Sequence, residues 1–172
     1  ITTQGNNSFF GHNVGSSSTT SNSVAMGFEA LRYATGSLNT AVGFRAMLLA
    51  STAADCTALG AQSLYSATGS ECVGIGGIAG YSSTSALSCT YVGHAAGYSN
   101  LTANNVTAIG RRALYLCTGA NNTALGVSAG ANLTTGTGCI IIGSGVNAQS
   151  ATGDNQINIG DAFRRDTADN IT

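Results

Sequence analysis

The stretch Asn39-Thr40-Ala41-Val42-Gly43 decides the fold, because near copies of it recur along almost the whole chain. The clearest copies are Cys-Thr-Ala-Leu-Gly at 56–60, Val-Thr-Ala-Ile-Gly at 106–110 and Asn-Thr-Ala-Leu-Gly at 122–126. Each copy ends in a glycine, here called the anchor glycine, and successive anchors lie only 16 or 17 residues apart. A short unit repeated at a fixed period is typical of a solenoid, in which each unit, or rung, stacks on the next. The anchors are Gly11, Gly27, Gly43, Gly60, Gly76, Gly93, Gly110, Gly126, Gly143 and Gly160.

The residues before each anchor have the chemistry of a β-strand. The residue directly before the anchor is apolar in every rung, from Phe10 to Ile159, so we expect every rung to bury it. Two places earlier most residues are β-branched, and the residue between the two is alanine or glycine in most rungs. A helical repeat needs about 30 residues or more, so this period leaves room for about two or three short strands and tight turns. The prediction is an all-β parallel solenoid (β-roll or β-helix) of about ten rungs.

Charged residues are scarce: the 172-residue chain has no lysine, six arginines and seven acidic residues. Strands that are apolar or small on both faces are usually buried on both, whereas one narrow coil buries only its inside. We therefore expect the second face to pack against sister chains in a homo-oligomer, or to be covered by the returning half of the rung. A net charge of −1 gives no electrostatic footprint for nucleic acid. No apolar run approaches the roughly 20 residues of a membrane-spanning helix, so we expect no membrane insertion.

The repeats form one domain over residues 1–163, and residues 164–172 read as a polar C-terminal extension or a junction to a following domain. Because residue 1 is Ile and no signal peptide is recognisable, we expect the chain to begin within a longer protein.

Two stretches carry a family resemblance: Ser-Asn-Ser-Val-Ala-Met-Gly at 21–27 and Ala-Thr-Gly-Ser-Leu-Asn-Thr-Ala-Val-Gly at 34–43. They resemble the head repeats of trimeric autotransporter adhesins, and are similar to the Asn-Thr-Ala-x-Gly-x-x-Ala repeats of bacteriophage and other viral tail fibres. The adhesin resemblance implies a parallel β-roll, trimerised along a common axis, that projects from a surface to bind a target. The rungs here are longer than is typical of adhesin heads, so the viral fibre fits better.

The fibre resemblance implies a homotrimeric structural segment, the shaft or head of a tail fibre, that supports host attachment from the virion surface. A bacterial adhesin head, extracellular or on the cell surface, is the alternative. The stretch at 155–161 also resembles the junction before a chaperone or tip domain in such fibres.

A column of tyrosines is the first candidate for receptor binding. Tyr65, Tyr81, Tyr98 and Tyr115 lie five positions after their anchors in consecutive rungs. Because stacked rungs lie about 4.8 Å apart, these side chains form either a structural spine of stacked rings or an exposed stripe for a cell-surface glycan. Phe28 and Phe44 form a shorter ladder with the same two interpretations.

Two further groups of charged residues are weaker candidates. His94 and Arg111 share a column with Arg112 alongside, a small basic patch suited to an acidic glycan or to plain solvation. Asp55 and Glu71 are adjacent in the column five before the anchor, where paired carboxylates could bind a cation or serve a glycosidase. No third polar group recurs beside them, so we expect a solvated turn edge, no metal, no cofactor and no enzyme activity.

Two uncharged columns complete the analysis. Cys56, Cys72 and Cys89 stand four positions before consecutive anchors, in a column shared with several asparagines. We expect these thiols to be free, buried and packed as compact ladder residues. A threonine column three positions before the anchor is compatible with an ice-binding solenoid, although we expect it to point inward. Its threonines are Thr40, Thr57, Thr90, Thr107 and Thr123.

Overall fold

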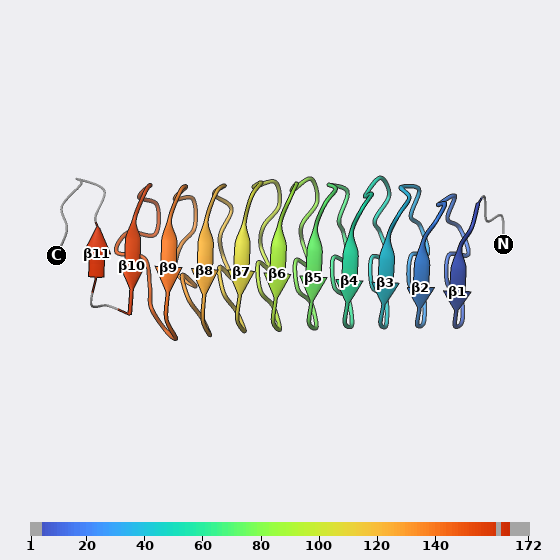
Figure 1. The fold of residues 1–172 in the computed structure, drawn as a ribbon, viewed down its shortest axis with the longest axis horizontal. Coiled ribbons are helices and arrows are strands. Elements are labelled where there is room, and N and C mark those ends of the chain that lie inside the picture. Colours follow the sequence, from blue (N-terminus) through green and yellow to red (C-terminus); the bar gives the residue numbers. More distant parts are fainter. Residues whose placement is uncertain (1–4, 161–162, 166–172) are drawn as a thin grey trace.

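A computed structural model describes residues 5–160 and 163–165, and it is a straight stack of β-strands (Figure 1). Ten strands lie side by side in sequence order and are all parallel, and an eleventh strand closes the C-terminal side. The described residues contain no helix. The strands are β1 (Ser8–Phe10), β2 (Val24–Met26), β3 (Thr40–Val42), β4 (Thr57–Leu59), β5 (Val73–Ile75), β6 (Thr90–Val92), β7 (Thr107–Ile109), β8 (Thr123–Leu125), β9 (Ile140–Ile142), β10 (Ile157–Ile159) and β11 (Phe163–Arg165).

Equivalent positions of neighbouring rungs face each other across the sheet. Thr40 pairs with Thr57, and Thr57 pairs in turn with Val73. This register confirms the predicted parallel β-solenoid. The expected number of strands per rung was too high, because each rung contributes one strand of three residues and the rest is stacked turns and bends. The turns are held by backbone hydrogen bonds between rungs, such as Leu64 N–H to the Ala79 carbonyl at 2.9 Å.

The middle residue of each of the strands β1–β10 faces the interior, which corrects the expectation that the residue before the anchor is buried. Ala58 is fully buried, whereas Leu59 beside it is 48% exposed. The same alternation places the threonine column outside the coil, so the expectation that it points inward is also wrong: Thr57 is exposed and Thr107 is half-buried.

The interior is too narrow for a large side chain in most strands. Buried leucine or methionine side chains four positions after the anchor, such as Leu64, fill the space opposite the strands. A Cβ atom added to Gly74 would lie 2.6 Å from Ser63 Oγ and 2.8 Å from Leu64 Cγ. Alanine and glycine therefore occupy the inward strand position, and the larger residue before the anchor is left outside.

Where the inward strand residue is a large hydrophobic one, glycine stands four positions after a nearby anchor, and the clearest case is β6. Tyr91 occupies the inward position of β6 and is fully buried. Gly80 and Gly97 replace the leucine in the two adjacent turns, and a Cβ at Gly97 would lie 2.1 Å from the Tyr91 ring. The Tyr91 hydroxyl accepts a hydrogen bond from Asn100 Nδ2 at 2.6 Å. Glycine here provides room for the ring, since Leu64 adopts a similar positive φ at the same place in its own rung.

The anchor glycines are required by both backbone conformation and space. Gly43 has φ 138°, and a Cβ there would lie 2.5 Å from the carbonyl oxygen of Gly60 in the next rung. Left-handed conformations also recur at ordinary residues, five before and two and four after the anchor. This repeated backbone geometry gives every rung the same path.

The C-terminal side of the stack ends in a reversed strand. β11 pairs antiparallel with β10, with Asn158 opposite Arg164. The expected boundary after residue 163 therefore falls inside a strand, and residues 166–172 of the expected extension lie outside the described part of the chain.

Candidate functional site

The tyrosine ladder consists of Tyr65, Tyr81, Tyr98 and Tyr115, and the structure stacks all four rings as predicted. Successive ring centroids lie 4.9, 5.4 and 5.1 Å apart, with interplanar angles of 10°, 10° and 16°. All four residues are half-buried. Because each inner ring is covered on both faces by its neighbours, a ligand alongside the ladder meets ring edges and not ring faces. A sugar can therefore stack on an aromatic face only at the two ends of the ladder.

The basic patch meets the ladder at one end. The guanidinium carbon of Arg112 lies 4.9 Å from the ring centroid of Tyr115. Arg111, Arg112 and His94 are all exposed. At the inner position Tyr81, burial and then the neighbouring Tyr65 and Tyr98 raise the pKa of the hydroxyl above its ordinary value, so this hydroxyl is protonated at neutral pH. Together these residues form an aromatic stripe with two guanidinium groups beside one end.

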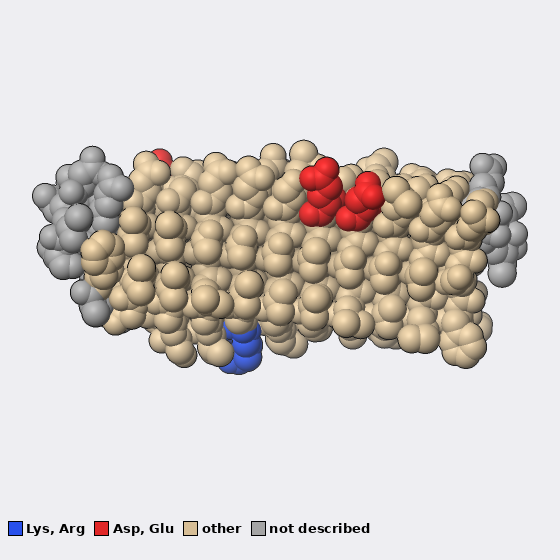
Figure 2. Space-filling model, viewed as in Figure 1, with Lys and Arg blue, Asp and Glu red and all other residues tan. Residues whose placement is uncertain are grey.

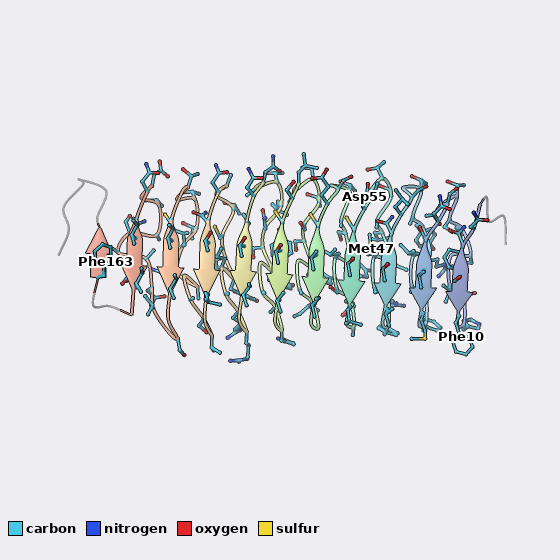
Figure 3. All side chains as sticks on the ribbon, viewed as in Figure 1. Phe10, Met47, Asp55 and Phe163 are labelled. Carbon is cyan, nitrogen blue, oxygen red and sulfur yellow. The ribbon has the colours of Figure 1, made fainter. Side chains whose placement is uncertain are left out.

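Asp55 and Glu71 are exposed and lie at equivalent places of adjacent rungs. Figure 3 shows Asp55 at the upper edge of the rod, where Figure 2 shows acidic side chains. Both have left-handed backbones, with φ of 56° and 60°. Asparagine and aspartate tolerate this conformation well, which explains why asparagine dominates this column. Ser88 Oγ donates a hydrogen bond of 2.8 Å to Glu71. In the described part of the chain no three His, Cys, Asp or Glu side chains come together as a metal site.

The cysteine column is an internal hydrogen-bonding ladder. Cys56, Cys72 and Cys89 are free and buried, as predicted. The Cys72 thiol donates to the Ala86 carbonyl at 3.3 Å, and the amide of Asn39 donates to the Ala53 carbonyl at the equivalent place. The thiol and the amide thus donate equivalent hydrogen bonds to the backbone in their respective rungs. Hydrogen bonding with Cys56, together with burial, raises the pKa of Cys72 to about 11, which disfavours the reactive thiolate.

Sequence reasoning missed an ion-pair cluster in the first rungs. Glu29 is 6% exposed and holds two arginines: Arg45 Nε lies 2.8 Å from its carboxylate, and Arg32 also pairs with it. Burial tends to raise the pKa of Glu29, but the hydrogen bond and charge of Arg45, assisted by Arg32, hold it below its usual value. The clue in the sequence was the one-rung spacing of Glu29 and Arg45.

The predicted phenylalanine ladder is present and is one ring longer than expected. Phe28 stacks on Phe44 with ring centroids 5.6 Å apart, and His12 stacks on Phe28 at 5.4 Å. The guanidinium of Arg45 lies over the Phe44 ring at 5.0 Å. His12 lies in the same column one rung earlier, so column position would have found it.

The outward side of strands β1–β10 is here called the outer sheet face. It consists of the residues one and three positions before each anchor, and none of them is charged. Seven of the residues directly before the anchor are more than a third exposed. They are Phe10, Met26, Leu59, Ile75, Ile109, Leu125 and Ile159.

Comparisons of the chain with protein-family models, with curated proteins and with solved structures find no match. Within the described residues, no helix has the length and apolarity needed to cross a bilayer.

Proposed function

We propose that this chain is a non-enzymatic structural segment of a fibre, the shaft or head of a viral or phage tail fibre, that supports host attachment as a homotrimer. The observation that carries the proposal is the unbroken in-register stack of ten parallel strands. Each rung is hydrogen-bonded to the next along the strands and through the turns. Such a stack is a stiff, elongated element without a hinge, which is the mechanical property that a fibre needs.

The tyrosine ladder and the basic patch are the proposed receptor contacts of this fibre. Ring edges along the ladder, ring faces at its ends, and the exposed guanidinium groups of Arg111 and Arg112 suit a cell-surface glycan that carries acidic groups. His94, one rung before Arg111, adds a further donor. No cofactor, nucleic acid or membrane insertion enters this function.

Electron microscopy with an antibody raised against the rod tests the fibre proposal on material from the source organism. Labelling of fibres on virus particles supports the tail-fibre assignment and a virion-surface location. Labelling of a bacterial cell surface supports the adhesin alternative instead. Labelling of neither structure would overturn both assignments.

Ice binding is a second candidate, favoured by the outward position of the threonine column. Thr40 and Thr57 are exposed, and Thr90, Thr107 and Thr123 are half-buried on the same face. Regularly spaced hydroxyl groups beside an aliphatic column form an ordered uncharged surface. Thermal hysteresis of the purified protein tests this candidate, and replacement of Thr57 by Lys should abolish any activity. A freezing point equal to that of buffer excludes it.

A further inference from the structure

The stacked rings of the tyrosine ladder also have the arrangement that oxidative coupling of phenols requires. Tyr65 and Tyr81 have ring centroids 4.9 Å apart, and their planes differ by only 10°. The pair Tyr81 and Tyr98 and the pair Tyr98 and Tyr115 stack in the same way, at 5.4 and 5.1 Å. All four residues are half-buried, so each is in part open to an oxidant in solution.

We propose that the tyrosine ladder is a site of oxidative cross-linking, at which tyrosines of neighbouring rungs are joined as dityrosine by a haem peroxidase and hydrogen peroxide. Each of two neighbouring tyrosines loses one electron and its hydroxyl proton, which leaves two phenoxyl radicals. The radicals form a carbon–carbon bond between the ring carbons next to the hydroxyl groups. The hydrogen on each bonded carbon then moves to the phenol oxygen. The two electrons and two protons that were removed convert one hydrogen peroxide to two waters.

Stacking is the geometry from which phenoxyl radicals couple. The unpaired electron occupies π orbitals that extend above and below the ring plane, so the new bond forms between facing rings. Neighbouring rings in the ladder have interplanar angles of 10°, 10° and 16°. Equivalent residues of stacked rungs also start from backbones about 4.8 Å apart, so the rings extend side by side. The reacting carbons therefore need little movement, which gives coupling within the ladder the advantage of preorganised reactants.

The two tyrosines outside the ladder lack such a neighbour. Tyr33 is 41% exposed, but the residues one rung away in its column are Ser17 and Leu49. Tyr91 is fully buried, and its hydroxyl accepts a hydrogen bond from Asn100. Within the described residues, stacking of tyrosine on tyrosine is confined to the ladder. Coupling inside one chain should therefore be confined to it as well.

The cross-links would fasten the middle of the stack. Tyr65 and Tyr81 are 16 residues apart, and Tyr98 and Tyr115 are 17 residues apart, so two links join four consecutive rungs in pairs. A covalent tie restricts the unfolded chain, as a disulfide does. We therefore expect the oxidised protein to unfold at a higher urea concentration than the untreated protein. This role is independent of the proposed fibre function and of any receptor.

The test compares two double variants with the same number of tyrosines. Tyr98→Phe combined with Tyr115→Phe leaves Tyr65 and Tyr81 as neighbours. Tyr81→Phe combined with Tyr115→Phe leaves Tyr65 and Tyr98, which are two rungs apart. Phenylalanine keeps every ring in the stack, so both variants should fold, which circular dichroism checks.

Each protein is treated at low concentration with a haem peroxidase and hydrogen peroxide, and then with a thiol reductant that removes any disulfide. Dityrosine fluorescence is measured on single chains separated under denaturing conditions, and peptide masses locate the links. We expect dityrosine within single chains of the wild type and of the variant with neighbouring tyrosines. The variant with separated tyrosines should give at least about 10-fold less.

Equal yields in the two double variants would overturn the proposal, because stacking would then not direct the coupling. Links found only between chains would also overturn it, as would a wild type without dityrosine under conditions that couple free tyrosine. A urea midpoint that oxidation leaves unchanged would overturn the fastening role. If the variant with separated tyrosines unfolds, Tyr65→Phe combined with Tyr98→Phe carries the same expectation, since it leaves Tyr81 and Tyr115 two rungs apart.

Discussion

At the scale of single residues, most of the unusual side chains in this protein are explained by position within the rung. The column of asparagines, with Asp55 and Glu71 among them, follows the left-handed corner that precedes each strand. The thiols of Cys56 and Cys72 take the place of an amide in an internal ladder. Glu29 is the exception, because its burial with two arginines is specific to one pair of rungs.

Replacement of Glu29 by Gln should remove an acid-dependent part of the stability. Because the folded-state pKa of Glu29 lies below its usual value, its stabilisation is present above the unfolded-state pKa of about 4.3. It is lost as the pH falls through the lower folded-state pKa. Melting temperatures measured from pH 6 to pH 2 should fall less steeply in Glu29→Gln than in the wild type. Glu71→Gln, at an exposed corner, is the control, and an identical acid slope in Glu29→Gln would contradict the prediction.

Cys72→Asn should keep or increase stability, whereas Cys72→Ala should lose about 1–3 kcal/mol. Asparagine at this column already donates to the opposite carbonyl and accepts from the next rung, as Asn39 does with Ala53 and Cys56. Urea unfolding of both variants measures the difference. In the wild type, a thiol reagent should modify Cys56, Cys72 and Cys89 only after denaturant is added. Rapid modification of the native protein would place these thiols outside the core.

At the scale of the strand, one face is inside and the other outside, and a single-residue shift exchanges them. Ala58→Glu should therefore unfold the chain or cost at least about 3 kcal/mol, since it buries an unpaired carboxylate in a filled space. Leu59→Glu, one residue further along the same strand, should leave the circular dichroism spectrum of the chain unchanged. Equal melting temperatures for the two variants would show that the faces are assigned wrongly.

Alanine substitutions in the tyrosine ladder should lower the free energy of unfolding by an amount that depends on the position of the ring. Tyr81→Ala removes two stacking contacts and should cost about 1–3 kcal/mol, whereas Tyr65→Ala removes one and should cost about half as much. Tyr33→Ala, an exposed ring outside the ladder, is the control. Binding to host cells or glycans is measured on the same variants. Loss of binding in Tyr65→Ala at temperatures where the variant is fully folded supports the receptor role, and loss of binding only in proportion to unfolding supports a spine.

The sequence was sufficient to predict the strand before each anchor and the columns, although not the number of strands per rung, because the anchor period places Thr40, Thr57 and their equivalents side by side. It did not reveal which strand face is buried. Leu59 and Ile75 are the more apolar residues, and apolarity alone assigns them to the core. The decisive quantity is the space inside the coil, which depends on Leu64 reaching across from the turn. The pairing of Tyr91 with Gly80 and Gly97 likewise depends on contacts between rungs that no single repeat displays.

At the scale of the whole molecule, the rod has two different ends. Figure 3 marks Phe10 at the N-terminal side and Phe163 at the C-terminal side. β11 runs against the direction of the other strands and covers the free edge of β10. Uncovered strand edges are templates for pairing with further chains, so this reversed strand separates one rod from the next.

Arg165→Pro should therefore promote end-to-end association. Arg165 lies opposite Ile157, whose backbone groups face β11 because β9 bonds to residues 156 and 160 instead. Proline at 165 cannot donate to β10, so the edge of β10 becomes available to another molecule. Sedimentation velocity should show species that grow with protein concentration. Arg165→Ala keeps the backbone donor and removes the same charge, and it should sediment like the wild type. Equal behaviour of the two variants would show that β11 does not protect the edge.

The residues with left-handed backbone conformation have a consequence for how the rod folds. Residues such as Leu31, Met47 and Ile78 hold positive φ angles, at a cost of roughly 1–2 kcal/mol each. A lone rung has no neighbour to compensate for this strain, so it does not keep its shape. A folded rung acts as a template on which the next rung folds. The folded stack therefore grows outward from the first rungs that come into contact. Amide hydrogens should then exchange fastest at both tips and slowest near β6.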